Sequence, residues 1–290
     1  MFSFDLLINA LVIGVLLGGF YCSLALGLSV SFGLLDVVNI AHPAFIILGS
    51  YIAYMMGLWI GLDPIVTGIL FAPVFFVLGL VIYRIYYTSF EKRGAEALRG
   101  LAFFFGLMFI VEVGLIIVYG VDYRSVEVSY VGPSIDIGFV GIPLRMLVPF
   151  GVSMVMAAIL ITYLSRTFTG RAIQAVAQDR MALQLMGADP VRIKQFAFGI
   201  SLATCSIAGA LLIIIIPVEP SVGRLYIGPV FAIVVLAGLG SVNGTIYAAI
   251  IIGVAESIVA TFFGPSWAPA VAFGILLAVL GLRPSGLFGR

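Results

Sequence analysis

Charged residues are scarce in this sequence. Of its 290 residues, 9% are Asp, Glu, Lys or Arg, whereas 63% are hydrophobic. A soluble domain carries roughly a quarter charged residues, so the composition excludes an ordinary soluble fold. It predicts an all-α polytopic membrane protein, because helices satisfy their own backbone hydrogen bonds in lipid. The formal net charge of +1 gives no sign of nucleic-acid binding.

Motifs of several enzyme classes are also absent. The lysines are Lys92 and Lys194, and neither follows glycine, which excludes a nucleotide-binding P-loop. The single histidine, His42, excludes a zinc HExxH motif, and Cys22 and Cys205 lie in separate apolar runs. We therefore expect a non-catalytic protein that itself binds no metal or other cofactor. In ATP-driven transport, a separate subunit would have to bind ATP and Mg²⁺.

Apolar runs long enough to cross a membrane recur along the whole chain. A transmembrane helix needs roughly 20 apolar residues. The candidate runs are 6–28, 44–60, 64–87, 101–119, 146–164, 196–216, 226–239, 245–263 and 267–282. Because 226–239 and 267–282 are short, we predict eight or nine transmembrane segments, with re-entrant segments as candidates among them. They form a single transmembrane domain of residues 1–290. The start of the chain lacks a basic signal-peptide region, so the first run is predicted to remain as a span.

The positions of lysine and arginine predict the orientation, because short cytoplasmic loops are enriched in them. Residues 88–100 and 165–195 and the C-terminus are basic and are predicted to lie inside. Residues 120–143 and 217–225 are predicted to lie outside. Nine crossings then place the N-terminus outside, and one re-entrant run would reverse that placement.

Residues 165–195 form the longest charged interruption of the apolar sequence. They combine five cations with apolar residues at helical spacing, which indicates one or two short surface helices. Gly187 suits a left-handed turn, and Asp189–Pro190 suits the start of a new helix. A basic loop that only fixes topology needs no apolar stripe, so we predict that this segment docks on another protein. The residues assigned to docking are Ile173, Val176, Asp179, Arg180, Leu183, Met186 and Gly187.

Two polar breaks interrupt the apolar runs. Residues 31–45 contain Asp36, Asn39 and His42, and residues 238–245 contain Asn243 among three glycines. Non-helical backbone at membrane depth persists only where protein or a water-filled cavity satisfies it, so both breaks are candidates for a transport path. The alternative is two ordinary turns at the surface. The faint pattern that the two breaks share is no evidence of a repeat by itself.

Two acids, Glu112 and Glu256, lie deep inside candidate spans. An unpaired charge at the bilayer centre costs about 2.5–3.5 kcal/mol on insertion scales, so both are predicted to face the bundle interior. They could line a substrate path, relay protons or join helices by hydrogen bonding. We favour joining helices, because the sequence offers no basic residue deep within the spans as a partner.

Four blocks of the sequence resemble a known family in order. They are GLSVSFGLLDVVNIAHPAFIILGSYIAY (27–54), GRAIQAVAQDRMALQLMGADPVRIKQFAF (170–198), IGPVFAIVVLAGLGSVNGTIYAAIIIGVAES (227–257) and LRPSGLFGR (282–290). Together they cover nearly the whole chain. They resemble the H-type permease subunit of branched-chain amino-acid ABC importers. Two features depart from the family pattern. The block 170–198, which resembles the family's cytoplasmic coupling loop, lacks the usual glutamate before Gly187, and Pro43-Ala44 replaces the Gly-Glu or similar pair that often follows the histidine.

The resemblance implies a subunit of an importer in the prokaryotic inner membrane. Its partners would be a second related permease, two ATP-binding subunits inside and a solute-binding protein outside, and 165–195 would contact the ATP-binding subunits. The departures leave the cargo open between branched-chain or related amino acids and urea, short amides or other small organic solutes. An ion-coupled secondary transporter and a non-transporting scaffold are the alternatives of other classes.

Overall fold

A computed structural model describes residues 4–93, 96–137, 140–283 and 285–289. The helices are α1 (Phe4–Leu28), η1 (Ser29–Leu34), α2 (His42–Ile60), α3 (Pro64–Ser89), η2 (Glu91–Arg93), α4 (Glu96–Tyr119), α5 (Leu144–Arg166), α6 (Phe168–Gln178), α7 (Arg180–Leu185), α8 (Pro190–Ile215), η3 (Pro220–Val222), α9 (Gly223–Ala237), α10 (Val242–Phe263), η4 (Pro265–Trp267) and α11 (Ala268–Leu282). Within these residues, 9 helices are long and apolar enough to cross a membrane, which confirms the all-α polytopic prediction. Residues 1–3, and 284 and 290 of the C-terminal motif, lie outside the described part.

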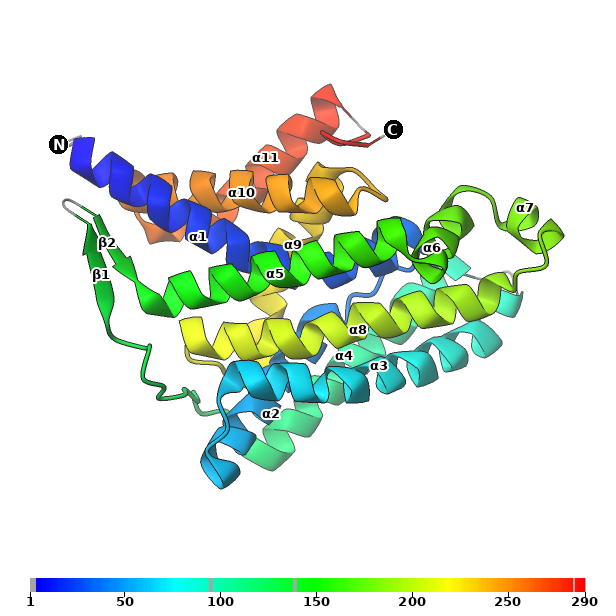
Figure 1. Cartoon of the computed structure of the whole chain (residues 1–290), viewed down its shortest axis with the longest axis horizontal. Coiled ribbons are helices and arrows are strands. Elements are labelled where there is room, and N and C mark those ends of the chain that lie inside the picture. Colours follow the sequence, from blue (N-terminus) through cyan, green and yellow to red (C-terminus); the bar gives the residue numbers. More distant parts are fainter. Residues whose placement is uncertain (1–3, 94–95, 138–139, 284, 290) are drawn as a thin grey trace.

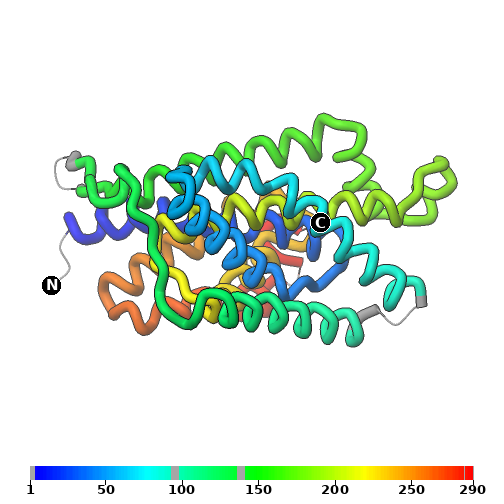
Figure 2. Tube along the Cα trace, turned by 90° about the horizontal axis from the view of Figure 1, so that it is seen from below, coloured from blue at the N-terminus to red at the C-terminus, as the bar shows by residue number. Residues whose placement is uncertain are grey.

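Helices α1, α5, α8 and α10 run roughly along the longest axis of the molecule, and short elements lie at both of its ends (Figure 1). Helices α6 and α7 project from one end, which is the predicted cytoplasmic end, in both views (Figures 1 and 2). At the other end lies an antiparallel hairpin of β1 (Ser134–Ile137) and β2 (Val140–Pro143), with Ser134 opposite Pro143. The charge pattern had assigned these ends to opposite sides of the membrane.

Two central helices, α1 and α8, run in opposite directions and each packs closely on one neighbour (Figure 1). Helix α1 lies along α10, where a Cβ on Gly18 would come 2.5 Å from the Cα of Ile250. Helix α8 lies along α3, where a Cβ on Gly79 would come 2.7 Å from the Cα of Gly199. Glycine allows this close approach because it has no side chain, which is typical of packing between membrane helices.

Both central helices are followed by non-helical backbone and then by a shorter helix. After α1 and its π-helical last turn, residues 35–41 are non-helical and include Asp36 at φ 57°, and α2 then begins at His42. After α8, residues 216–219 and one 3₁₀ turn lead into α9, which begins at Gly223. The starts of α2 and α9 meet, since a Cβ on Gly223 would lie 3.2 Å from the Pro43 carbonyl oxygen.

These starts lie inside the bundle rather than at its surface. His42 contacts Leu24 and Cys205, which are 10 residues from the ends of the α1–η1 span and of α8. At 1.5 Å rise per residue this is about 15 Å of helix, or half of the hydrocarbon thickness. The backbone therefore re-enters the membrane at 35–41 and again before α9. The first of these places lies within the polar break at 31–45, and the second precedes α9, which corresponds to the short run 226–239.

At the predicted outer end, the long loop after α4 is fixed to the bundle at two points. Arg124 and Val218 pair through both backbone hydrogen bonds at 2.8 Å. The Tyr130 hydroxyl donates to Asp63 at 2.8 Å, and Asp63 also caps α3 by accepting from the Ile65 amide. Burial and the Asp63 carboxylate both raise the pKa of Tyr130, so this phenol stays protonated as a donor.

Candidate functional site

The polar break at 31–45 is buried among α1, α2 and α8. His42 is 1% exposed, and its Nε2 lies 3.1 Å from the Leu24 carbonyl oxygen. A carbonyl only accepts, so Nε2 donates and Nδ1 is left to accept from the Cys205 thiol at 3.4 Å. His42 therefore joins three helices by hydrogen bonds, and this contact pattern belongs to a structural histidine.

The other two residues of this break lie in different environments. Asn39 is fully buried, and neither atom of its side-chain amide has a hydrogen-bond partner among the described residues. Asp36 is exposed and occupies the left-handed turn at φ 57°. The break thus places an unsatisfied amide, rather than a charge, inside the bundle. A buried amide without partners is unfavourable unless something polar reaches it.

The second break, 238–245, lies at the predicted cytoplasmic end. Asn243 is exposed and lines an open cavity of about 390 Å³ together with Gly33, Gln174 of α6 and Phe288 near the C-terminus. Gly240 approaches Gly33, since a Cβ on Gly33 would come 2.8 Å from the Gly240 nitrogen. This break is therefore a turn at the end of the bundle, next to the predicted docking segment.

Glu112 has a basic partner, contrary to the expectation from the sequence. The Arg224 Nε donates to Glu112 Oε2 at 2.8 Å, and its Nη2 donates to Oε1. Glu112 is 3% exposed, whereas the Arg224 side chain is 51% exposed. The prediction failed because residues 217–225 were assigned to an outer loop, while Arg224 belongs to the first turn of α9.

Glu256 joins α10 to α1, which is the helix-joining role favoured from the sequence. It is 4% exposed and accepts a hydrogen bond from the Tyr21 hydroxyl at 2.6 Å. At the next residue of α10, the Ser257 hydroxyl donates to the Ala10 carbonyl at 2.7 Å. These polar contacts supplement the glycine packing between the same two helices.

The docking segment folds as the sequence indicates. It forms α6, a break at Asp179 and α7, and the Asp179 carboxylate caps α7 by accepting from the amides of Met181 and Ala182. Gly187 adopts φ 80°, which confirms the left-handed turn. Asp189 then caps α8 by accepting from the Val191 amide at 2.9 Å. The local signals thus define two short helices and the start of α8.

The apolar stripe of this segment, however, faces the chain itself. Ile173, Val176 and Leu183 are 0%, 2% and 7% exposed, so the prediction that they form an open docking face is wrong. Periodicity shows that one face of a helix is apolar, but not which partner buries it. Met186 is 84% exposed and remains available for docking. The exposed large apolar residues of the segment are Phe168, Met181, Leu185 and Met186.

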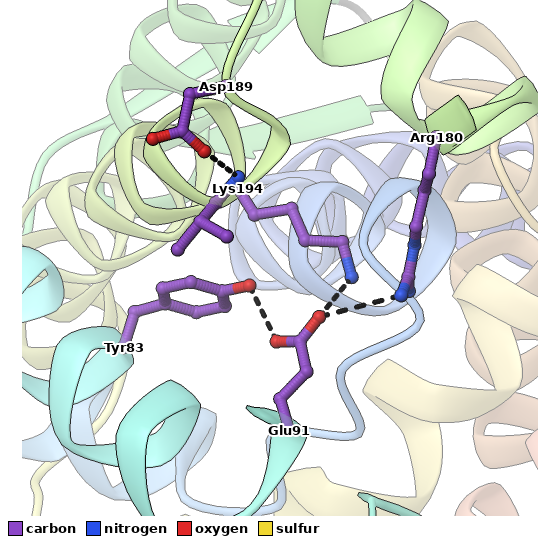
Figure 3. A network of polar contacts seen from close by, with 6 residues as sticks. Tyr83, Glu91, Arg180, Asp189 and Lys194 are labelled. Carbon is purple, nitrogen blue, oxygen red and sulfur yellow. Dashed lines mark hydrogen bonds and ion pairs between the residues drawn. The ribbon is translucent and has the colours of Figure 1, made fainter. Parts of the chain in front are cut away.

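An ion network anchors α7, and sequence reasoning missed its centre (Figure 3). The Glu91 carboxylate accepts from Lys194 Nζ at 2.7 Å and from the Tyr83 hydroxyl at 2.7 Å. Arg180 Nη1 lies 3.6 Å from the same carboxylate. The side chains of Glu91 and Lys194 are 8% and 4% exposed. Glu91 and Lys194 are 103 residues apart, so no local pattern could have paired them.

Comparison with known proteins assigns the chain to a family. The family model described as "Branched-chain amino acid transport system / permease component" matches residues 10–280. The chain belongs to this permease family. It is 28% identical to the permease protein BraD of Pseudomonas aeruginosa over 98% of this chain and 96% of BraD. It is 27% identical to LivH of Escherichia coli over 96% of this chain and 94% of LivH.

The permease is also related to a second kind of subunit. It is 27% identical to LivM of Escherichia coli over 92% of this chain and 67% of LivM. BraD, LivH and LivM are each named as high-affinity branched-chain amino acid transport system permease proteins. No solved structure matches the permease. The chain is thus a multi-pass membrane protein that serves as a permease component.

Proposed function

We propose that this chain is one of two permease subunits of an ATP-driven importer for branched-chain amino acids in the prokaryotic inner membrane. The family match over residues 10–280 carries the proposal. The absence of a P-loop in the sequence supports it, because energy must then come from other subunits. Urea, short amides or related small solutes remain the alternative cargo.

The proposed complex has partners on three sides. Similarity to both LivH and LivM supports a related second permease as the lateral partner. Two ATP-binding subunits would lie on the side of α6 and α7 and hold the ATP and Mg²⁺, while this chain binds no cofactor. A solute-binding protein would dock on the opposite side, near the loop after α4.

The Glu91 network provides a route for coupling. It joins α7 to the ends of α3 and α8, so movement of α7 acts directly on two membrane helices. The exposed Leu185 and Met186 lie at the C-terminal end of α7, where an ATP-binding subunit can hold them. Alternating access requires this contact to differ in free energy between the two states of the permease.

The proposal is tested with the whole complex in proteoliposomes. Co-expressed subunits are purified through a tag on this chain, and uptake of L-leucine is measured with and without internal ATP. ATP-dependent uptake at a clamped proton gradient is expected. Uptake that follows the proton gradient without ATP would instead identify a secondary transporter. Uptake of urea or acetamide but not leucine would favour the alternative cargo, and purification without ATP-binding subunits would contradict the importer.

A further inference from the structure

Arg224 places a half-exposed cation at membrane depth. It follows Gly223, which packs on Pro43 at the start of α2 inside the bundle. Its partner Glu112 lies 7 residues before the end of α4 at Tyr119, which is about 10 Å of helix. The guanidinium therefore lies below the outer end of α4, within the apolar layer.

Contact with lipid is unfavourable for the Arg224 guanidinium. A charged side chain in the hydrocarbon layer is costly and normally faces protein or a water-filled cavity. The bundle leaves 51% of the Arg224 side chain uncovered. If two related permeases pair about a pseudo-two-fold axis, the same face of each lies against the other. An exposed cation at this depth therefore indicates that this face of the bundle lies against the second permease and lines the transport path between the two.

The contacts of Arg224 fix its guanidinium but leave donors available. Glu112 accepts from Nε and Nη2, and the Phe109 ring centroid lies 5.3 Å from the guanidinium carbon. Among the described residues, no acceptor lies within hydrogen-bond distance of Nη1. The Nη1–Nη2 edge can therefore offer two parallel N–H groups, which match the two oxygens of a carboxylate.

We propose that Arg224, held by Glu112 and Phe109, is a subsite that receives the α-carboxylate of the transported amino acid within the membrane. The inference rests on the proposed function and adds the chemical group that this chain recognises. A primary amide in place of the carboxylate carries no charge and cannot accept on both atoms, so the subsite would discriminate against it.

The test measures binding to the purified complex of both permeases and both ATP-binding subunits in the absence of nucleotide. Radiolabelled L-leucine is displaced by unlabelled L-leucine or by L-leucinamide. For the wild type we expect L-leucine to displace the radiolabel at a concentration at least about tenfold lower than L-leucinamide. This is the difference expected from a charge-assisted hydrogen-bonded pair. Arg224→Gln should abolish this preference, and Arg224→Lys should retain part of it. Leu225→Ala, at a neighbouring exposed residue, is the matched control and should keep it.

Three outcomes would overturn the proposal: no leucine binding or no preference in the wild type, an unchanged preference in Arg224→Gln, or a full wild-type preference in Arg224→Lys when Arg224→Gln fails to assemble. The last outcome would show that the paired N–H groups of Arg224 do not produce the preference. The uptake assay separates the two proposals. Without ATP-dependent leucine uptake by the wild type the importer function fails, whereas normal uptake with an unchanged preference in Arg224→Gln removes only the subsite.

Discussion

Glu91 and Lys194 form a buried ion pair of 2.7 Å between the segment after α3 and the first turns of α8. The Tyr83 hydroxyl satisfies the second carboxylate oxygen, so the acid is held by hydrogen bonds as well as by charge. The third partner, Arg180, reaches the network from α7, and its side chain is 45% exposed. The network thus has a rigid part within the bundle and one adjustable link to α7.

The first prediction concerns the rigid part. Glu91→Leu leaves Lys194 buried without its acid and should destabilise the permease by about 3–5 kcal/mol. The double variant Glu91→Leu with Lys194→Met should recover much of this loss, because no uncompensated charge remains. Thermal unfolding in detergent measures both. A double variant no more stable than Glu91→Leu alone would show that the pair does not account for the loss.

The adjustable link gives a second prediction. Arg180→Gln should change stability by about 0–1 kcal/mol, as expected for a partly exposed pair. It should lower the number of leucine molecules transported per ATP hydrolysed, because α7 is no longer tied to Glu91. Arg171→Gln on α6 is the control, because Arg171 donates to the Arg166 carbonyl and forms no ion pair within the described part of the chain. Equal transport-to-hydrolysis ratios in the two variants would remove the coupling role of Arg180.

Most of the spans could be predicted from the sequence, because burial in lipid requires long apolar runs that composition reveals directly. Local capping signals also placed the turn at Gly187 and the start of α8, since they act within a few residues. The short run 226–239 indicated an incomplete span, but local signals could not predict how deep in the bundle the backbone before α9 lies. Arg224 beside Glu219 reads as an outer loop, and only packing of Gly223 on Pro43 shows that the chain turns back inside.

Contacts between residues far apart in the sequence also limit what could be predicted of the candidate site. Composition identifies Glu112 as an acid that needs a partner, but its partner is 112 residues away. The break at 31–45 was compared with 238–245, whereas its structural counterpart is the backbone between α8 and α9. Which face of a helix meets which neighbour depends on tertiary packing, and this is why Ile173 and Leu183 were assigned to the wrong surface.

The third prediction tests the packing of α1 on α10. An added side chain at Gly253 would collide with the backbone of Gly18, so Gly253→Val should destabilise the permease by about 1–3 kcal/mol through overpacking. Gly274 on α11 has no atom within 4 Å of an added Cβ, and Gly274→Val is the matched control. Melting temperatures of the two purified variants provide the comparison. Equal losses would mean that helix propensity, not packing, sets the effect.

Orientation is tested by a fourth prediction. In a background without Cys22 and Cys205, a cysteine at Ser134 on β1 should react with an impermeant maleimide from outside the cell. A cysteine at Thr169 on α6 should react only after the membrane is permeabilised, because the basic segment 165–195 is predicted inside. Labelling of both positions in intact cells would overturn the predicted orientation, and reversal of the two patterns would invert it.

The last prediction concerns the surface that α7 offers to an ATP-binding subunit. Leu185 and Met186 are each 84% exposed, and a large apolar side chain contributes roughly 1.5–3 kcal/mol when a partner buries it. Leu185→Ala with Met186→Ala should therefore weaken the contact by about two orders of magnitude or more while the permease stays folded, since about 1.4 kcal/mol is tenfold.

Leu183→Ala on the same helix serves as the matched variant, because Leu183 is 7% exposed and packs within the chain. It should lower the melting temperature of the permease more than the double variant does. The Leu183→Ala permease that remains folded should still retain more of the ATP-binding subunits than the double variant retains. Pull-down at equal membrane expression, together with thermal unfolding, separates the two effects. If the double variant retains the ATP-binding subunits at wild-type level and Leu183→Ala releases them, the docking surface lies elsewhere and α7 acts through its buried face.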